Sequence, residues 1–283
     1  MPGNPVTIPQ LMEWKKSQRK ITALTAFDFL TARALDNAGI DLVLVGDSLA
    51  MVALGHDTTL PVTVDEMLHH TRAVGRALKR ALLVGDMPFM SYQSSTEQAV
   101  ANAGRFLKEA GAQAVKLEGG AQIESQVKAI VAAGIPVMGH LGLTPQSVHQ
   151  LGGYKVQGKS YLDARRIKAD AVKLQKAGAF ALVLEAIPAD LAGEITGELD
   201  IPTIGIGAGS QCDGQILVTQ DMLGMNPDFV PKFVKQFADI GKQMELALKG
   251  YAKEVQEQTF PEAQHSYLMD SGNIKSVKQK KTG

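Results

Sequence analysis

Acidic residues stand at or near the ends of several apolar segments of the sequence. The segments are Asp41–Asp47, Ala81–Asp86, Ala114–Gly119 and Ala181–Glu185. In the third, Lys116 and Glu118 are two residues apart, so both side chains point to the same face if the segment is a β-strand. Burying two ionisable groups is costly unless they are paired or bind a ligand. We therefore expect this face to line a cavity that holds a charged ligand.

Three of these carboxylates, Asp47, Asp86 and Glu118, are candidates for a metal site. Carboxylates gathered at close quarters repel one another, and a divalent cation is the usual compensation. A site built only from oxygen ligands favours Mg²⁺, which retains water or substrate oxygens in its coordination shell. Two simpler interpretations stay open: each Gly-Asp pair could form a helix-capping turn, and Lys116 could belong to an ion pair without a function. The ammonium group could equally bind a substrate carboxylate.

Two further polar residues end predicted strands. Glu185 lies between Ala-Leu-Val-Leu and Ala-Ile-Pro, an apolar setting that suits a general base, although it could instead cap the next helix. His140 is either a catalytic residue, with an ordinary pKa near neutrality, or a hydrogen-bonded core histidine. The glycine-rich turn around Gly207 could present backbone N–H groups to an anion or simply be a tight turn.

Eight segments have the apolar composition of strands, and they alternate with amphipathic segments. The predicted strands are 21–26, 41–47, 82–86, 114–118, 136–141, 180–185, 201–206 and 215–218. The predicted helices between them are 29–38, 64–78, 96–110, 122–133 and 161–177, with a capping box at Thr63 and Glu66. This alternation predicts an α/β fold, either a (β/α)₈ TIM barrel or a doubly wound open sheet.

The acidic strand ends favour the barrel. Its strands all end at one mouth, where Asp47, Asp86, Glu118 and Glu185 would meet, whereas an open sheet would scatter them. The length suits one domain, which we place at residues 1–260. Residues 261–283 have little apolar periodicity, so we expect a flexible basic C-terminal tail that carries Lys275, Lys278, Lys280 and Lys281.

A further helix is predicted before the first strand and another after the last strand. An N-terminal helix capped by Thr7 should pack over one end of the barrel, and its apolar residues Leu11 to Trp14 offer a contact for a second copy of the chain. A long final helix should begin near Val230. Its apolar residues recur with helical spacing and are expected to face the core, and they are Phe233, Val234, Phe237, Ile240, Met244, Leu248 and Tyr251.

The overall composition argues against a nucleic-acid or membrane partner. Lys and Arg together number 29, as do Asp and Glu, so there is no global charge to attract nucleic acid or an anionic membrane. No apolar run is long enough to span a bilayer. The start of the chain lacks the pattern of a secretory signal, and Cys212 is the single cysteine, which fits a reducing cytoplasm. The expected partners are small molecules or other copies of the chain.

A set of motifs, in order from about residue 7 to residue 255, closely resembles the ketopantoate hydroxymethyltransferase (3-methyl-2-oxobutanoate hydroxymethyltransferase) family. The motifs are Thr25–Asp28, Leu44–Leu49, Gly55–Thr59, Pro61–Thr63, Gly85–Phe89, Val115–Gly119, Gly139–Pro145, Gly152–Gln157, Ile204–Gly209 and Cys212–Gly214. Phe27 and Phe29 stand where many members have tyrosine, so any hydrogen bond from those hydroxyl groups is absent.

The resemblance implies a fold, a reaction and a set of residue roles. The fold is a TIM barrel of the phosphoenolpyruvate/pyruvate-barrel type, and the enzyme is a cytoplasmic homodecamer. It transfers the one-carbon unit of 5,10-methylenetetrahydrofolate to 3-methyl-2-oxobutanoate, giving ketopantoate and tetrahydrofolate in the first step of pantothenate biosynthesis. Mg²⁺ would be held by Asp47, Asp86 and Glu118. The keto acid would contact Asp47, Ser48, Asp86 and Lys116, Glu185 would be the base, and His140 and Gly207 are candidates for auxiliary or folate-side roles.

Two other functions compete with this one. A Mg²⁺-dependent 2-oxo-acid carbon-carbon lyase or phosphonate mutase would use the same type of barrel and acidic strand ends. Many such lyases carry a Lys-Lys/Arg-Cys-Gly-His loop, which this sequence does not contain. A barrel without activity that serves as a scaffold would be expected to lose the residues of the mouth, but all four carboxylates and Lys116 are present.

Overall fold

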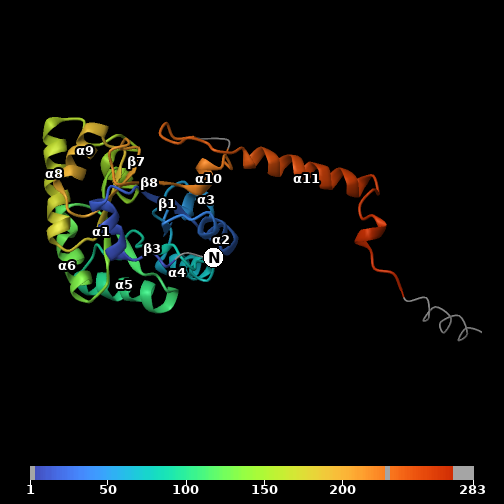
Figure 1. The fold of residues 1–283 in the computed structure, drawn as a ribbon, viewed down its shortest axis with the longest axis horizontal. Coiled ribbons are helices and arrows are strands. Elements are labelled where there is room, and N and C mark those ends of the chain that lie inside the picture. The colour runs from blue at the N-terminus through green and yellow to red at the C-terminus, as the bar shows by residue number, and fades with distance from the viewer. Residues whose placement is uncertain (1–3, 227–229, 270–283) are drawn as a thin grey trace, which may run out of the picture.

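The computed structural model describes residues 4–226 and 230–269 and shows a closed barrel of eight parallel strands (Figure 1). Each strand pairs with the next, and the last pairs with the first, which confirms the predicted barrel and rules out the open sheet. The strands are β1 (Ile21–Thr25), β2 (Leu42–Val45), β3 (Leu82–Asp86), β4 (Ala114–Glu118), β5 (Val137–Gly142), β6 (Ala181–Glu185), β7 (Thr203–Ile206) and β8 (Gly214–Leu217).

Helices surround most of this barrel. The α-helices are α1 (Ile8–Lys16), α2 (Phe29–Asn37), α3 (Leu49–Val52), α4 (Val64–Gly75), α5 (Thr96–Ala110), α6 (Glu124–Ala132), α7 (Val148–Leu151), α8 (Tyr161–Lys176), α9 (Ala189–Glu198), α10 (Thr219–Met222) and α11 (Ile240–Gln256). Short 3₁₀ segments are η1 (Ala121–Ile123), η2 (Pro145–Ser147) and η3 (Ala263–His265). The predicted capping box at Thr63 and Glu66 is present at the start of α4. Helix α9 is not predicted from the sequence because Gly193 and Gly197 weaken its helical signal.

Side chains of the strands form two apolar layers. Alternate residues such as Leu44, Val84 and Val183 fill the barrel interior. The residues between them, such as Val115 and Leu182, pack outward against the helices. On β4, Lys116 and Glu118 have the same parity as the interior residue Ala114, so both point inward, as expected from their spacing.

Helix α1 closes the end of the barrel where the strands begin. Thr7 caps it by accepting a hydrogen bond from the backbone N–H of Gln10, as predicted. Leu11 and Trp14 are buried among interior residues at the starts of the strands, such as Ile21. The expectation that Leu11 to Trp14 would contact a second copy is therefore wrong, because this apolar surface is already covered within the chain.

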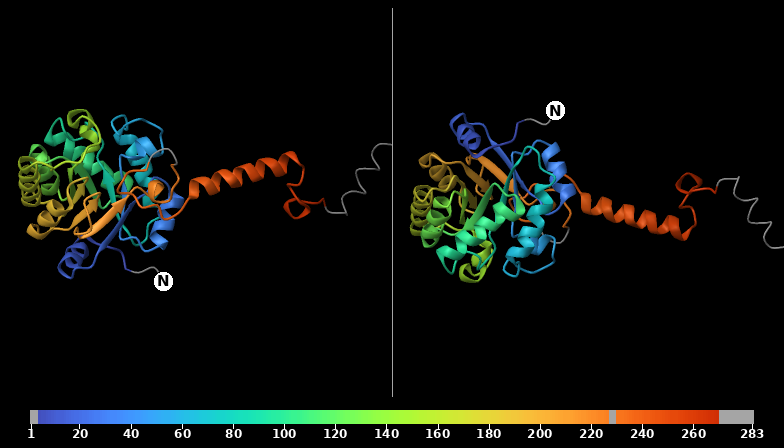
Figure 2. Two further views of the ribbon diagram at one scale, coloured as in Figure 1. Left: turned by 90° about the horizontal axis from the view of Figure 1, so that it is seen from above. Right: turned by 90° about the horizontal axis from the view of Figure 1, so that it is seen from below.

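Helix α11 differs from its prediction in both its start and its packing. It begins at Ile240 rather than near Val230, and none of its residues is buried. Figures 1 and 2 show it extending away from the barrel. The expectation that its apolar stripe faces the core is wrong. The four lysines of the predicted tail lie outside the described residues, and the domain boundary at residue 260 stays a prediction. Within residues 4–226 and 230–269, no helix is long and apolar enough to cross a membrane.

Candidate active site

The ends of five neighbouring strands bring the predicted site residues together. Asp86 is the last residue of β3, Glu118 the last of β4 and Glu185 the last of β6. Asp47 comes after β2, separated from it by one glycine, and His140 lies on β5 directly beside Glu118 in the strand register. Each strand is short and parallel to its neighbours, so residues far apart in sequence meet at one mouth.

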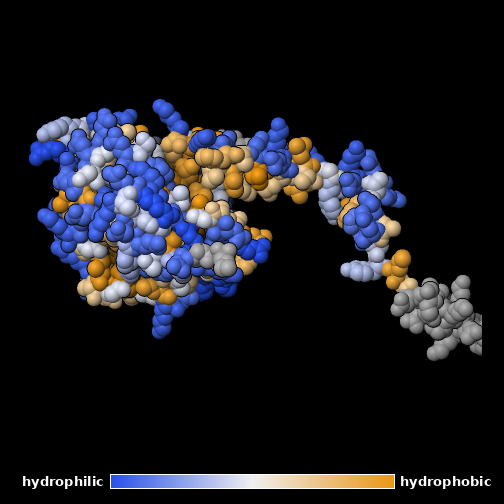
Figure 3. Space-filling model, in the orientation of Figure 1, coloured by the Kyte–Doolittle hydropathy of each residue, from blue (hydrophilic) through white to orange (hydrophobic). Residues whose placement is uncertain are grey.

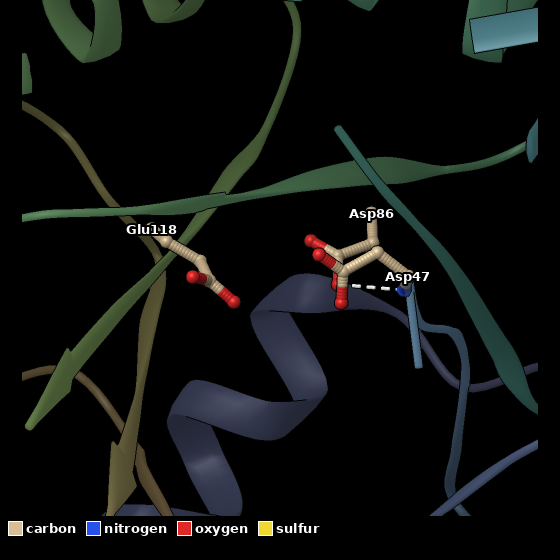
Figure 4. Close-up of side chains that lie close together, drawn as sticks. All are labelled: Asp47, Asp86 and Glu118. Atoms are coloured by element: carbon tan, nitrogen blue, oxygen red, sulfur yellow. Dashed lines mark hydrogen bonds between the residues drawn. The ribbon is translucent and has the colours of Figure 1, made fainter. Parts of the chain in front are cut away.

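Asp47, Asp86 and Glu118 form a buried acidic cluster (Figure 4). One carboxylate oxygen from each lies within 4.8 Å of the others. The backbone N–H of Asp47 donates a hydrogen bond to Oδ2 of Asp86 at 3.2 Å, which fixes the two strand ends relative to each other. Three oxygen ligands at this spacing suit a divalent cation such as Mg²⁺.

Lys116 supplies a positive charge beside the cluster. Its Nζ lies 2.6 Å from Oδ2 of Asp86 and 3.5 Å from Oε1 of Glu118. Burial works to lower the pKa of Lys116, but the charges of Asp86, Glu118 and Asp47 outweigh burial and raise it. The lysine is therefore a permanent cation, and the simple ion pair considered from the sequence is one part of a larger network.

The charge of Lys116 does not balance the three carboxyl groups of the cluster. Burial raises the pKa of Asp47, and repulsion from Asp86 and Glu118 raises it further. The pKa of Asp86 is raised as well, chiefly by burial, although Lys116 opposes this. Oδ1 of Asp86 is buried, and no hydrogen-bond donor of the described residues reaches it. A bound cation would compensate this buried oxygen and the repulsion among the carboxylates. The residues present therefore fit a divalent metal ion.

His140 connects this cluster to Glu185. Its Nδ1 lies 3.2 Å from Oε1 of Glu118, and its Nε2 lies 3.2 Å from Oε2 of Glu185. Burial works to lower the pKa of His140, but the charge of Glu118 and contacts with both carboxylates raise it to about 9. At neutral pH the ring is therefore a cation, not the group titrating near neutrality that the sequence suggested.

Gln146 is an important residue of the site that sequence reasoning did not identify. It lies on η2, directly after the Gly139–Pro145 motif, and is buried. Its Nε2 donates to Oδ2 of Asp47 at 2.9 Å, and its backbone N–H donates to Oε2 of Glu118 at 3.0 Å. One residue thus holds two carboxylates of the cluster. The only sequence signal for a role of Gln146 is its position directly after the Gly139–Pro145 motif.

Tyr92, which sequence reasoning also missed, orients Gln146. The Tyr92 hydroxyl lies 2.8 Å from Oε1 of Gln146 and donates to it, so the amide NH₂ group must face Asp47. The same hydroxyl accepts a hydrogen bond from the backbone N–H of Glu118 at 3.1 Å. Tyr92 is fully buried in the loop between β3 and α5. It therefore ties the end of β4 to the residue that positions the cluster.

The two remaining predicted residues lie at the mouth with different surroundings. Ser48 is next to Asp47 at the start of α3 and is half-buried, which leaves its hydroxyl free to face a substrate. Gly207 comes directly after β7 with a φ of 62°, and a Cβ atom there would approach Phe233 to 2.8 Å. The close approach of the Phe233 ring explains why position 207 is a glycine, because a larger side chain would collide with the ring. The substrate-binding role of Ser48 and the folate-side role of Gly207 stay predictions.

Comparisons with known proteins agree on one family. The family model described as "Ketopantoate hydroxymethyltransferase" matches residues 5–263. A 3-methyl-2-oxobutanoate hydroxymethyltransferase of Thermoanaerobacter sp. (strain X514) is 62% identical over 260 residues, which cover 92% of this chain and 95% of that protein. The protein of the same name from Clostridium novyi (strain NT) is 58% identical over 264 residues, covering 93% of this chain and 96% of the relative.

Solved structures with the same fold are much more distant in sequence. Phosphonopyruvate hydrolase in complex with oxalate and Mg²⁺ has a TM-score of 0.60 at 13% identity, covering 97% of this chain and 95% of that chain. A 2,3-dimethylmalate lyase described as a PEP mutase/isocitrate lyase superfamily member has a TM-score of 0.59 at 15% identity, covering 95% and 93%. At such identities the likeness shows the fold alone, which is the predicted (β/α)₈ barrel.

Proposed function

The chain belongs to the ketopantoate hydroxymethyltransferase family, and we propose that its acidic mouth binds Mg²⁺ and a 2-oxo acid while Glu185 acts as the base. The reaction transfers a hydroxymethyl group to 3-methyl-2-oxobutanoate and yields ketopantoate. The one-carbon donor is 5,10-methylenetetrahydrofolate, which leaves as tetrahydrofolate. The observation that carries the proposal is the link from the acidic cluster through His140 to Glu185.

Asp47, Asp86 and Glu118 would hold the metal ion. If all four carboxylates of the mouth are ionised, Lys116 and His140 balance two of them and leave two negative charges, which matches one divalent cation. A bound cation would supply Lewis-acid polarisation of the keto oxygen. Lys116 and Ser48 lie beside the cluster and are suited to bind the substrate carboxylate and so to position the keto acid on the cluster.

Glu185 would remove the proton from C3 of the keto acid. Its side chain is 16% exposed, more than the buried cluster, so a substrate seated on the cluster can reach it. The His140 ring lies against it, with Nε2 3.2 Å from Oε2 of Glu185, and helps to orient its carboxyl group. The deprotonated C3 would then form a bond to the methylene carbon of the folate as one of the two bonds from that carbon to nitrogen breaks. Water would supply the hydroxyl group to the same carbon as its second bond to nitrogen breaks, and the two nitrogens would take up protons, so that ketopantoate and tetrahydrofolate are released.

The second substrate would enter from the open side of the mouth. Tyr154 and Met51 lie there with exposed fractions of 52% and 37%, and the Tyr154 hydroxyl is 3.6 Å from the Met51 sulfur. The pKa of Tyr154 is raised by burial first and then by the charges of Asp47, Glu185 and Glu118, which places its ring near the cluster. An aromatic and a thioether side chain suit the flat ring of a folate.

The high identity to two named hydroxymethyltransferases favours this reaction over the lyase or phosphonate mutase, which share only the fold. The homodecamer, the cytoplasmic location and the place in pantothenate biosynthesis are parts of the proposal that rest on the family resemblance. The test is an assay of tetrahydrofolate release with a panel of 2-oxo acids. Turnover should require 3-methyl-2-oxobutanoate or a close homologue and a divalent ion. Cleavage of a 2-oxo acid without folate would instead support the lyase.

A further inference from the structure

A cavity of about 690 Å³ lies between helix α8 and the loops that follow β4 and β5. It is separate from the acidic cluster, because none of the three carboxylates of the cluster lines it. It is nevertheless close to the active site, since its lining residue Gly119 directly follows Glu118 and its lining residue Ser147 directly follows Gln146. Small-molecule sites in proteins typically measure about 300–1,000 Å³, so the cavity can hold a ligand together with bound water.

Thr144 contributes a buried hydroxyl group to the lining of this cavity. The residue is only 9% exposed, and within the part of the chain that the structure describes its hydroxyl forms no hydrogen bond. The hydroxyl of the half-buried Ser147, three residues further on, is also without a partner among the described residues. Leaving a buried polar group unpaired costs free energy, so both hydroxyl groups are available to bind a ligand in the cavity.

One wall of the cavity carries two opposite charges on α8. Asp163 and Arg166 are one helical turn apart, and Oδ1 of Asp163 lies 3.9 Å from the nearest guanidinium nitrogen of Arg166. This distance is too long for a hydrogen bond, and no acceptor of the described residues is hydrogen-bonded to Arg166. Oδ2 of Asp163 accepts a hydrogen bond from the Ser160 hydroxyl at 2.8 Å. The wall therefore presents free guanidinium donors beside a free carboxylate oxygen.

Asp170, a buried residue of α8, holds the opposite side of the cavity in place. Its Oδ1 accepts a hydrogen bond from the backbone N–H of Ala121 at 3.3 Å, which ties the loop after β4 to the helix. A Cβ atom on Gly120 would lie 2.2 Å from Oδ2 of Asp170, so the close approach of loop and helix requires a glycine there. The cavity is therefore a preformed part of the fold.

The rest of the lining includes three aliphatic side chains, those of Leu141, Leu151 and Ile167. Leu141 and Ile167 are buried, and none of the lining residues is aromatic. The barrel surface visible in Figure 3 is mostly hydrophilic, whereas this cavity combines an aliphatic wall with charged groups and hydroxyl groups. A ligand that matches the lining must therefore carry an aliphatic group and polar groups of both charges, and it has no need of a flat ring.

We propose that this cavity binds a small α-amino acid with an aliphatic side chain. The carboxylate and the ammonium group of an α-amino acid are adjacent, as are Arg166 and Asp163, and a guanidinium binds a carboxylate through paired N–H groups. The hydroxyl groups of Thr144 and Ser147 can donate to the same carboxylate. A ligand with a negative charge alone would face Asp163 and Asp170 without a compensating ammonium group. The site is independent of the proposed reaction.

The first test measures binding by isothermal titration calorimetry and needs no turnover. L-Leucine and L-valine should bind saturably to the dialysed protein. Two analogues of leucine that each lack one charged group, 4-methylpentanoate and 3-methylbutylamine, should bind at least about 10-fold more weakly. L-Glutamate and L-lysine should also bind more weakly, because their second charge would contact the aliphatic wall. The proposal is overturned if neither leucine nor valine binds at millimolar concentration, or if any of the other four ligands binds as tightly as leucine.

A pair of neighbouring arginines provides the matched variants for this titration. Arg166→Gln should weaken leucine binding about 10- to 100-fold, because it removes the charged donors to the carboxylate. Arg165→Gln should keep the wild-type affinity, since Arg165 is absent from the lining and lies over the Tyr161 ring at 5.7 Å. Both side chains are on the exposed surface of α8, so both variants should keep the wild-type melting temperature. Equal affinities in the two variants would overturn the proposal.

The second test distinguishes this cavity from the active site, which in the proposed reaction binds a 2-oxo acid of similar shape. Asp86→Asn changes the acidic cluster, which lies outside the cavity, and should leave the affinity for leucine unchanged. Thr144→Val replaces the unpartnered hydroxyl with a methyl group of similar size and should lower the affinity about 2- to 12-fold. Loss of leucine binding in Asp86→Asn, or wild-type affinity in Thr144→Val, would contradict binding in this cavity.

Discussion

Nε2 of His140 lies 3.2 Å from Oε2 of Glu185, and this contact joins the proposed base to the acidic cluster. The other ring nitrogen of His140 faces Glu118, so a single imidazole ring lies between a proposed metal ligand and the proposed base. The ring is buried on β5, which fixes its orientation. In the proposed mechanism, binding at the cluster and proton removal at C3 are therefore coupled through one side chain.

Replacing His140 should weaken catalysis without abolishing it. His140→Asn removes the cation beside Glu185 and the orienting contact on Glu118, and changes of this kind typically cost about 10- to 100-fold in activity or metal affinity. Initial rates of turnover and a metal titration would measure both effects. The exposed His149 provides the control, and His149→Asn should behave as wild type. Wild-type rates and affinity in His140→Asn would contradict the coupling.

Divalent ions should stabilise the protein through the acidic cluster. Mg²⁺ added to protein treated with a chelator should raise the melting temperature, because the ion binds the folded state and neutralises repelling carboxylates. Asp86→Asn should lose most of this gain and the metal-dependent activity while its circular dichroism spectrum stays unchanged. Full activity of that variant in excess chelator would refute the metal assignment.

Without metal, the protein should lose stability as the pH rises. Burial and the charges of Asp86 and Glu118 raise the pKa of Asp47 well above its ordinary value, so the folded state binds a proton that the unfolded state has released. The stabilisation is complete below the unfolded pKa and is lost as the pH rises through the raised folded pKa. Asp47→Asn removes this dependence and can still accept the hydrogen bond from Gln146. In chelator, the melting temperature of Asp47→Asn should exceed that of wild type by more at about pH 8 than at about pH 5. A difference in melting temperature that becomes smaller as the pH rises would contradict the raised pKa of Asp47.

Gln146 should prove to be a positioning residue for the cluster. Gln146→Ala removes the donor to the buried Asp47 carboxyl group and one of the two acceptors of the Tyr92 hydroxyl, which retains the Glu118 carbonyl, and this should cost about 1–3 kcal/mol of stability. Metal affinity, measured by calorimetry, should fall about 10- to 100-fold. Gln150→Ala, at an exposed position four residues away, should change neither quantity. A stability loss with unchanged metal affinity would show that Gln146 is purely structural.

Much of the fold follows from local patterns in the sequence. The strand ends Asp86 and Glu118 are predicted correctly because β3 is an apolar run that ends in Gly85-Asp86, while in β4 Lys116 and Glu118 alternate with apolar residues. Helix α11 is predicted as a helix from its 3.6-residue periodicity, but periodicity does not reveal which surface an apolar stripe covers. The same pattern arises whether the stripe packs on its own chain or on another.

The site is predicted less completely than the fold. Side chains alternate between the two faces of a strand, and the ends of all barrel strands converge at one mouth. These two rules predict that the mouth brings together Asp47, Asp86, Glu118 and Glu185. The role of Gln146 depends on the path of the loop after β5, and the burial of Tyr92 depends on long-range packing. Neither is encoded in a local pattern. The protonation of His140 is also a tertiary property, because it results from two carboxylates on neighbouring strands.

Exchange of the C3 proton of 3-methyl-2-oxobutanoate for deuterium, measured by NMR in heavy water with Mg²⁺ and without folate, tests the central proposal most directly. Glu185→Gln should still bind the keto acid but exchange about 10²- to 10⁴-fold more slowly, because it lacks the base. Asp47→Ala should lose binding and exchange together, whereas Glu198→Gln, at an exposed position on α9, should match wild type. Exchange at the wild-type rate in Glu185→Gln would contradict the assignment of Glu185 as the base.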